Sequence, residues 1–317
     1  MLERRLLGKT GMEVSRICFG SLTMAPLQGN FPPEQAAEIM AYGFSKGINF
    51  VDCAQLYRVY PYVGRALKIS PLGDRVIIAS KSYAYTGDMA REAVDEARRG
   101  LDRDVIDIFM LHEQESIFTV RGHREALDAL LEMKAKGIIR AVGLSTHYVA
   151  GADAAAALGL DVLHPLINVD GWGVVDGTRT MMEQAIARAV AAGVGVYTMK
   201  AFGGGNLHKK PRECLEYVRN LPGIASTALG MQSEDEIDAN VSFFETGSFT
   251  PEQEAAVKAK NRRLFIEEWC VGCGKCTEIC PNGAARVIDG RMEPEREKCV
   301  LCGYCAGVCD QYAIKVL

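Results

Sequence analysis

Eight of the eleven cysteines lie after residue 269, in two runs with the same spacing. The first run reads C-x2-C-x2-C-x3-C-P, and the second repeats that spacing but has Asp310 in place of the proline. This spacing is typical of bacterial ferredoxins, where the fourth cysteine of each run binds the other cluster. The sequence therefore predicts two [4Fe–4S] clusters, one bound by Cys270, Cys273, Cys276 and Cys309 and one by Cys299, Cys302, Cys305 and Cys280.

Zinc is the main alternative, because two zinc ions with four thiolate ligands each would also use eight cysteines. Zinc ribbons, however, usually bring cysteines in separated pairs. Here three cysteines stand two residues apart and a fourth follows. The spacing favours iron–sulfur clusters, and clusters of this kind predict one-electron chemistry.

The rest of the composition narrows the class of protein. Cys18, Cys53 and Cys214 are scattered, and together with the clusters they indicate a reducing compartment. The charged N-terminus has no apolar segment of a signal peptide, and no apolar run is long enough to cross a bilayer. A net charge of −4 gives no reason to expect nucleic acid as a partner. We expect a cytoplasmic protein that does not bind a membrane.

We predict two domains, residues 1–263 and residues 264–317. In the first, short apolar runs alternate with helical patterns, which indicates a parallel sheet. The expected strands are 17–19, 48–51, 76–79, 106–111, 141–144, 162–167, 194–198 and 224–229, and the expected helices are 34–45, 62–67, 89–101, 124–136, 148–158, 179–192, 212–219, 234–244 and 251–263. Eight strand–helix units in about 250 residues favour a (β/α)8 TIM barrel.

An open, doubly wound sheet is the rival architecture, but no G-x-G-x-x-G follows the first strand. Residues 5–15 contain the turn signal Gly8-Lys9-Thr10-Gly11 and are expected to form a hairpin below the barrel. The fold class is thus α/β, a (β/α)8 barrel followed by a small α+β ferredoxin-like domain.

Four polar residues stand at the ends of consecutive expected strands. Asp52 ends the second strand and Tyr57 follows it, Lys81 ends the third, and His112 ends the fourth. Functional residues of barrels lie at these strand ends, so we expect the four side chains to converge at one rim. A buried ion pair with a nearby tyrosine and histidine used only for packing is the alternative.

The four side chains suggest reduction of a carbonyl group. We expect the ammonium of Lys81, paired with Asp52, to lower the pKa of Tyr57, because a nearby positive charge favours the phenolate. Tyr57 would then donate a proton to the carbonyl oxygen, and His112 would hydrogen-bond the same oxygen.

At this point the chain resembles the aldo-keto reductases. The resemblance rests on Arg5-Leu6-Leu7-Gly8-Lys9-Thr10-Gly11, on Asn49-Phe50-Val51-Asp52-Cys53-Ala54 with Tyr57, on Lys81 and His112, and on Gly143-Leu144-Ser145. It implies that Asp52, Tyr57, Lys81 and His112 are the catalytic tetrad. It also implies NAD(P)H as hydride donor, bound without a Rossmann fold.

The resemblance also implies residues that bind the cofactor. Ser145 and Thr146 would lie beside the nicotinamide amide, with Thr146 where asparagine is common, and Asn168 would take the place of a glutamine. Met199 stands where the family often has a tyrosine that stacks on the nicotinamide, and Lys200 follows it. Asn240 fits the adenine contact.

Two loops are candidates for binding phosphate. Phe202 and the glycines Gly203, Gly204 and Gly205 follow the seventh strand, where backbone N–H groups can approach a pyrophosphate. Gly230 follows the eighth strand, and Ser233 with Glu236 forms a capping box at the start of the next helix. The carboxylates of residues 234–236 would repel a 2′-phosphate, so we expect NADH to be preferred over NADPH.

Two functions remain open from the sequence. In the first, the barrel reduces a small carbonyl substrate and exchanges electrons with the clusters, through a flavin or a substrate that accepts single electrons. In the second, the chain is an electron-transfer protein whose barrel is a docking scaffold or binds another cofactor such as flavin, and a partner redox protein meets the cluster domain.

Overall fold

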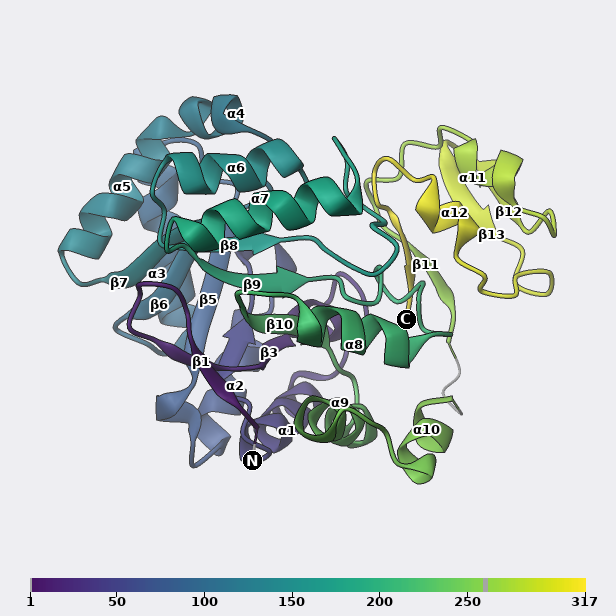
Figure 1. Cartoon of the computed structure of the whole chain (residues 1–317), viewed down its shortest axis with the longest axis horizontal. Helices are drawn as coiled ribbons and strands as arrows, with labels where there is room; N and C mark the ends of the chain where they lie inside the picture. The colour runs from purple at the N-terminus through teal and green to yellow at the C-terminus, as the bar shows by residue number, and fades with distance from the viewer. Residues whose placement is uncertain (1, 259–261) are drawn as a thin grey trace.

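A computed structural model describes residues 2–258 and 262–317. Eight parallel strands close into a barrel in the order β10-β3-β4-β5-β6-β7-β8-β9, which confirms the barrel and excludes an open sheet. The strands are β3 (Ile17–Gly20), β4 (Phe50–Asp52), β5 (Ile77–Ser82), β6 (Ile106–Leu111), β7 (Ile139–Thr146), β8 (Val162–Pro165), β9 (Gly195–Met199) and β10 (Ile224–Gly230). Figure 1 shows the barrel on the left and a smaller C-terminal lobe on the right.

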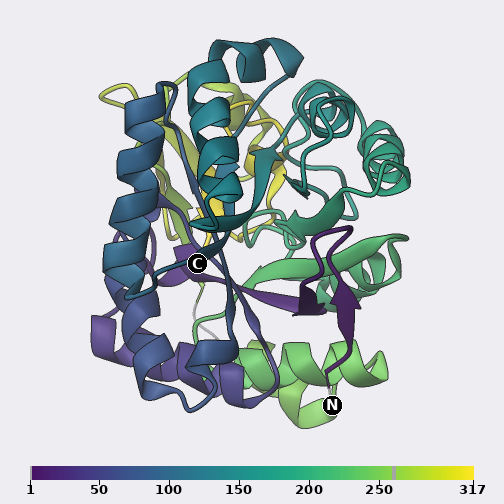
Figure 2. The same cartoon turned by 90° about the vertical axis from the view of Figure 1, so that its left-hand side faces the viewer.

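Helices surround the barrel, as Figure 2 shows from the side. They are α1 (Pro33–Ser45), α2 (Tyr60–Ile69), α3 (Gly87–Leu101), α4 (Ile117–Gly122), α5 (Arg124–Ala135), α6 (Val149–Ala157), α7 (Arg179–Ala191), α8 (Pro211–Asn220), α9 (Glu234–Thr246) and α10 (Pro251–Lys258), with 3-10 turns η1 (Ser21–Met24), η2 (Gln55–Tyr57) and η3 (Gly73–Arg75). The short helix α4 was not expected. The helix expected over 251–263 lies partly outside the described residues.

Among the described residues, no helix has both the length and the apolar character needed to cross a membrane.

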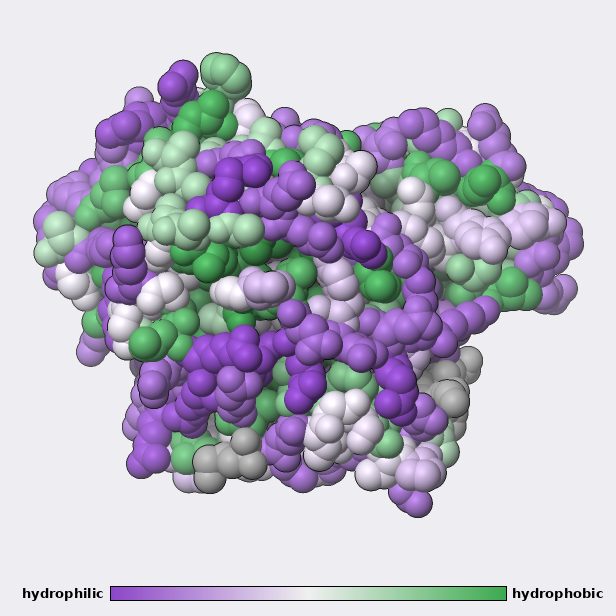
Figure 3. Space-filling model, viewed as in Figure 1, coloured by the Kyte–Doolittle hydropathy of each residue, from purple (hydrophilic) through white to green (hydrophobic). Residues whose placement is uncertain are grey.

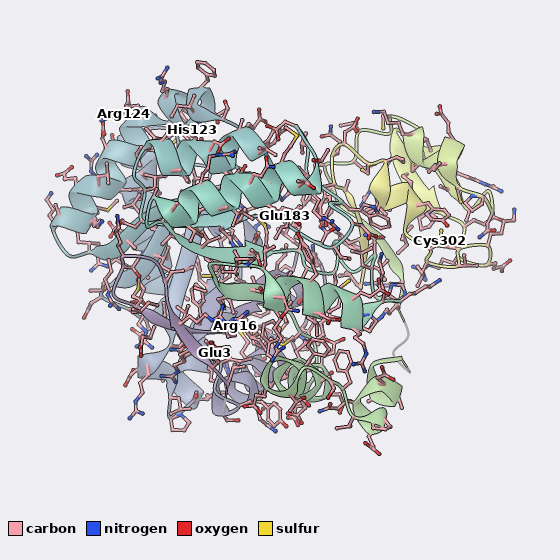
Figure 4. All side chains as sticks on the ribbon, in the orientation of Figure 1. Glu3, Arg16, His123, Arg124, Glu183 and Cys302 are labelled. Carbon is pink, nitrogen blue, oxygen red and sulfur yellow. The ribbon has the colours of Figure 1, made fainter. Side chains whose placement is uncertain are left out.

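The N-terminal segment forms the expected hairpin. Its strands β1 (Arg4–Leu6) and β2 (Glu13–Ser15) pair antiparallel, and Leu7, Met12 and Val14 join the core that fills the inside of the barrel. Glu3 and the buried Arg16 form an ion pair, with 3.2 Å between a carboxylate oxygen and a guanidinium nitrogen (Figure 4). The hairpin therefore closes the end of the barrel opposite the strand ends that carry the candidate site.

The C-terminal lobe consists of short elements with an internal repeat. They are β11 (Leu264–Ile266), α11 (Lys275–Ile279), β12 (Ala285–Ile288), β13 (Arg291–Pro294), α12 (Tyr304–Gly307) and β14 (Ile314–Val316). Strand β11 pairs with β14, and β12 pairs with β13. Gly274 and Gly303 precede the two helices with φ of 83° and 84°, so both cysteine runs make the same left-handed turn. Figure 3 shows hydrophobic residues reaching the surface of this lobe.

Strand β14 docks the lobe onto the mouth of the barrel. The backbone N–H of Val316 donates to the carbonyl of Gly204 at 2.9 Å, and the amide of Asn206 donates to the carbonyl of Ile314 at 2.9 Å. A Cβ on Gly205 would lie 1.9 Å from the carbonyl oxygen of Val316. The glycines after β9 therefore allow a second stretch of the same chain to approach closely.

We expect Gly205→Ala to weaken this docking. The new Cβ would clash with Val316, and φ at this position is +84°, so we expect a loss of about 2 kcal/mol beyond the backbone strain. The measurement is the midpoint of chemical denaturation of the cluster-loaded protein. Gly159→Ala is the matched control, because its φ is +64° and nothing lies within 4 Å of its Cβ. Equal shifts in the two variants would contradict the close packing.

Candidate functional site

A buried ion pair lies where β4 and β5 end. The ammonium of Lys81 donates to both carboxylate oxygens of Asp52, at 2.8 and 2.7 Å, and to the carbonyl of Cys53 at 3.0 Å. The hydroxyl of Tyr197, inside the barrel, donates to Asp52 at 2.8 Å. Lys81 is 1% and Asp52 5% exposed, so the pair is held away from water.

Tyr57 lies over this pair. It is in η2, and the left-handed Arg58 after it, with φ of 55°, turns the chain back toward the barrel. The centroid of its ring is 5.0 Å from the Lys81 ammonium and 5.8 Å from the ring of His112. The structure thus brings together the four polar residues that the strand ends predicted.

The expected effect of Lys81 on Tyr57 is wrong. Burial raises the pKa of Tyr57 well above its ordinary value, and the negative charges of Asp52 and Glu113 raise it further. These effects outweigh the attraction of Lys81, whose charge is shared with the carboxylate of Asp52. The phenol therefore keeps its proton, as a proton donor must.

His112 is neutral and has a free ring nitrogen. Burial, followed by the charges of Lys81 and Lys200, lowers its pKa well below the ordinary value. The Nδ1 atom is buried and has no hydrogen-bond partner. Tyr83 stacks on the ring with centroids 4.3 Å apart. Because buried polar atoms are normally paired, this nitrogen is a candidate contact for a ligand.

A long cavity begins at Asp52 and Tyr57 and extends between the loops after β9 and β10. Its empty volume is about 1370 Å³, with open solvent included. The predicted cofactor residues that line it are Met199, Lys200, Phe202, Gly204, Gly205, Gly230, Glu236 and Asn240. Most of the predicted nucleotide residues therefore share one cavity with the tyrosine.

The other predicted cofactor residues are engaged elsewhere. Ser145 accepts from the N–H of Glu113 at 2.9 Å, and Thr146 accepts from the N–H of Tyr148 at 2.9 Å. The side-chain amide of Asn168 is used within its own loop. Its NH2 group donates to the carbonyl of Trp172, and its oxygen accepts from the N–H of Trp172.

Gly203 and Ser233 also lie off the cavity lining. Ser233 caps α9 by accepting from the N–H of Glu236. The carboxylate of Glu236 accepts from the N–H of Gln232 at 2.7 Å. In a capping box it would accept from the N–H of Ser233, so here the bond reaches one residue farther back.

Four residues that line this cavity were not expected from the sequence. His164 lines the cavity and is 3.6 Å from Asp52, and burial lowers its pKa to about 4. His164 could have been predicted from its position near the end of β8, because functional residues of barrels lie at strand ends. Lys315, Val316 and Arg262 also line the cavity, but they come from beyond the barrel, and local sequence carries no sign of this.

Two hollows in the C-terminal lobe are surrounded by the cysteines. One is lined by Cys270, Cys273, Cys276 and Cys309, and the other by Cys280, Cys299, Cys302 and Cys305. Figure 4 labels Cys302 in this lobe. Each hollow thus receives three cysteines from one run and the fourth from the other, which is the pairing that the spacing predicts.

Backbone N–H groups lie close to three of these sulfurs. Backbone N–H groups of Met292, Ala284 and Ala313 point at sulfurs of Cys270, Cys280 and Cys309, at 3.4, 3.2 and 3.4 Å. Such bonds to sulfur help set cluster potentials.

One side chain of the lobe reaches the barrel site. Tyr312, three residues after Cys309, is 4% exposed and packs with Leu166 and Met199. Its ring centroid is 5.5 Å from that of His147. The loop that supplies a cysteine to one hollow therefore contacts the residues around the cavity.

Comparison with known proteins agrees with this geometry. The chain matches the model of the aldo/keto reductase family over residues 16–213 and the 4Fe-4S binding domain over residues 264–286. L-galactose dehydrogenase of Arabidopsis thaliana is 27% identical over 160 residues, 45% of this chain and 48% of that protein. 6-dehydroglucose reductase of Novosphingobium aromaticivorans is 28% identical over 158 residues, 44% of this chain and 50% of that protein.

The chain thus spans about half the length of these two relatives. Among solved structures, aldo-keto reductase AKR11C1 from Bacillus halodurans, in its holo form, has the same fold. Its TM-score is 0.64 at 20% identity, over 81% of this chain and 96% of that one. Because the family match covers more than half of the sequence, the chain belongs to the aldo/keto reductase family, and a 4Fe-4S binding domain follows its barrel.

Proposed function

We propose that the protein reduces a carbonyl substrate with NAD(P)H at Asp52, Tyr57, Lys81 and His112, and that this site is electronically coupled to two [4Fe–4S] clusters. One observation carries the proposal. The ring of Tyr57, whose phenol keeps its proton, has its centroid 5.0 Å from the buried ammonium of Lys81. It lies at the end of a cavity that is also lined by Lys315 of the cluster domain.

Each of the four residues has a distinct task. Tyr57 donates its proton to the carbonyl oxygen as negative charge develops there. The ammonium of Lys81 stabilises the resulting phenolate, and Asp52 fixes the position of that ammonium through two hydrogen bonds. The neutral ring of His112 bonds the same oxygen and orients the substrate.

Bound NAD(P)H would supply the hydride, and the clusters would carry single electrons. Because a hydride carries two electrons, exchange between them would pass through a bound flavin or a substrate that accepts single electrons. Met199, Phe202, Gly204, Gly230 and Asn240 line the part of the cavity that suits the dinucleotide. The preference for NADH rests on the three carboxylates in the first turn of α9, because they would repel a 2′-phosphate.

The docking of the lobe supports electronic coupling. Tyr312 lies between Cys309, whose carbonyl accepts from its N–H at 2.9 Å, and Met199 at the cavity. Cys273 is exposed, and Val271 and Val300 beside the cysteines are 61% and 56% exposed. These exposed apolar residues suit the docking of a partner redox protein.

The test uses protein purified without oxygen. We expect about eight iron and eight sulfide per chain, because two cubes contain four of each. We also expect steady-state reduction of an aldehyde with NADH, and weaker activity with NADPH. A preparation with full iron that reduced no carbonyl with either nucleotide would contradict the reductase proposal, and faster turnover with NADPH would contradict the charge argument.

A second function is favoured by one observation. Thr146 and Asn168 use their polar atoms within the protein, and the hydroxyl of Ser145 already accepts a bond from Glu113, so few of the expected contacts to a nicotinamide amide are free in this arrangement. This favours an electron-transfer protein whose barrel binds another cofactor, such as flavin. Flavin released from purified protein by denaturation, together with no binding of NADH, would support that function instead.

A further inference from the structure

The cavity is lined by two lysines that come from different domains. Lys200 follows β9, Lys315 lies in β14 and is 4% exposed, and both line the cavity. Their ammonium groups lie against the same ring, 4.4 Å and 3.5 Å from the centroid of Tyr312. The two charges are therefore no farther apart than the sum of these distances.

Neither ammonium has a carboxylate partner within 4.0 Å among the described residues. Lys200 donates to Nε2 of His147 at 3.1 Å, and Lys315 donates to the carbonyl of Tyr312. The carboxylate of Glu267, in the same junction, instead accepts from the amide of Gln28 at 2.7 Å. Both amines thus bond only neutral acceptors.

The carboxylates of Glu267 and Glu113 act on the two ammonium groups only from a distance. Two like charges this close together repel each other, and an anion in direct contact with both would offset the repulsion and the loss of water. Gly204 makes room for one of the two lysines. A Cβ at this position would lie 2.7 Å from Cδ of Lys315. The hydroxyl of Tyr312, in the same segment as Lys315, is also buried without a hydrogen-bond partner.

We propose that Lys200 and Lys315 form an oxyanion subsite that is complete only when the C-terminal lobe is docked, and that it binds a carboxylate or phosphate group of the ligand in the cavity. The inference concerns binding alone. It therefore stands or falls independently of whether Tyr57 donates a proton.

The subsite has a predicted pH dependence. Burial lowers the pKa of Lys200 to about 8, and it lowers that of Lys315 well below its ordinary value, with Lys200 lowering it further. The charged and titratable groups that face Lys200 are Glu113, His147, Glu267, Lys81 and Lys315. Because a lysine attracts an anion only when it is protonated, loss of the proton from Lys200 should lower the affinity about tenfold between pH 7 and pH 9.

The test is anaerobic titration calorimetry on the full, cluster-loaded chain. The probes are inorganic pyrophosphate and, separately, oxalate, added without nucleotide so that no turnover occurs. The variants are Lys200→Met and Lys315→Met, which keep the length of the side chain and remove its charge. Lys136→Met is the control, because Lys136 is 60% exposed and pairs with Glu132 on the barrel surface.

We expect at least one probe to bind the wild type and each pocket variant to bind it about tenfold or more weakly, while the control stays within about twofold. Loss of pyrophosphate binding would assign the subsite to the phosphates of a dinucleotide, and loss of oxalate binding alone would assign it to a substrate carboxylate.

Folding of the variants is checked by their melting temperatures without anion. A cooperative melting transition shows that a variant is folded, so that weaker binding by it reports the loss of the ammonium group. Equal affinities in wild type and both pocket variants, or no binding of either probe by the wild type, would overturn the proposal. So would an affinity that is unchanged between pH 7 and pH 9.

Discussion

Tyr57→Phe should lower kcat for carbonyl reduction by about 10² to 10⁴, because it removes the group that protonates the oxygen. Phenylalanine keeps the ring, and therefore the packing against His112 and over Lys81. The affinity for NADH should change little. The measurement is steady-state reduction of one aldehyde at saturating NADH, with nucleotide binding measured separately.

The control for this substitution is Tyr85→Phe, since Tyr85 is 56% exposed. Equal rates in wild type and Tyr57→Phe would remove the tetrad from the mechanism.

The rate should also be insensitive to the titration of Tyr57 and His112. The pKa of Tyr57 is raised by burial, so the phenol stays protonated throughout the accessible pH range. The pKa of His112 is lowered by burial, so the imidazole stays neutral. Neither group should therefore cause a loss of rate between pH 6 and pH 9.

Lys81→Met should destabilise the protein by about 3–5 kcal/mol, because the carboxylate of Asp52 would be left buried without its counter-ion. Asp52 would keep only the hydrogen bond of 2.8 Å from Tyr197 among its present side-chain partners. The measurement is urea denaturation of the cluster-loaded protein, followed by a probe of the barrel.

The double variant Asp52→Asn with Lys81→Met separates the buried charge from lost packing. It removes both charges, so it should be less destabilised than the sum of the two single variants. Simple additivity would show that the pair is not coupled, which would contradict the buried geometry. The surface pair of Lys134 and Asp161, 37% and 26% exposed, provides a comparison in which the same two steps should cost less.

Much of the fold could be predicted because parallel strands are buried on both faces. Strand β6, with the expected bounds Ile106–Leu111, is apolar except for Asp107 and lies between helical patterns. Strand ends were less certain, since β7 extends from Ile139 to Thr146 where 141–144 was expected. The helix α4 has six residues, too few to show a helical period in sequence.

The candidate site was predictable as far as it depends on local order along the chain. Asp52, Lys81 and His112 end neighbouring strands, so the barrel alone brings them together. The pKa of Tyr57 was not predictable, because its direction depends on how deeply the ring is buried and on the pairing of Lys81 with Asp52.

Contacts between the domains could not be inferred from local patterns. The glycines after β9 suggested a loop for pyrophosphate, yet the observed close approach to Gly205 is made by Val316. Their role in phosphate binding stays a prediction. Lys315 and Tyr312 read as ordinary residues near the C-terminus, and only the docking of β14 brings them to the cavity.

The most direct test of the account is the visible spectrum of anaerobic, iron-loaded protein after addition of NADH. If the barrel site and the clusters exchange electrons, the absorption of the clusters should bleach, and a carbonyl substrate added next should restore it. An unchanged cluster spectrum in protein that binds NADH and reduces the same carbonyl would contradict the account, because the two centres would then work without electronic contact.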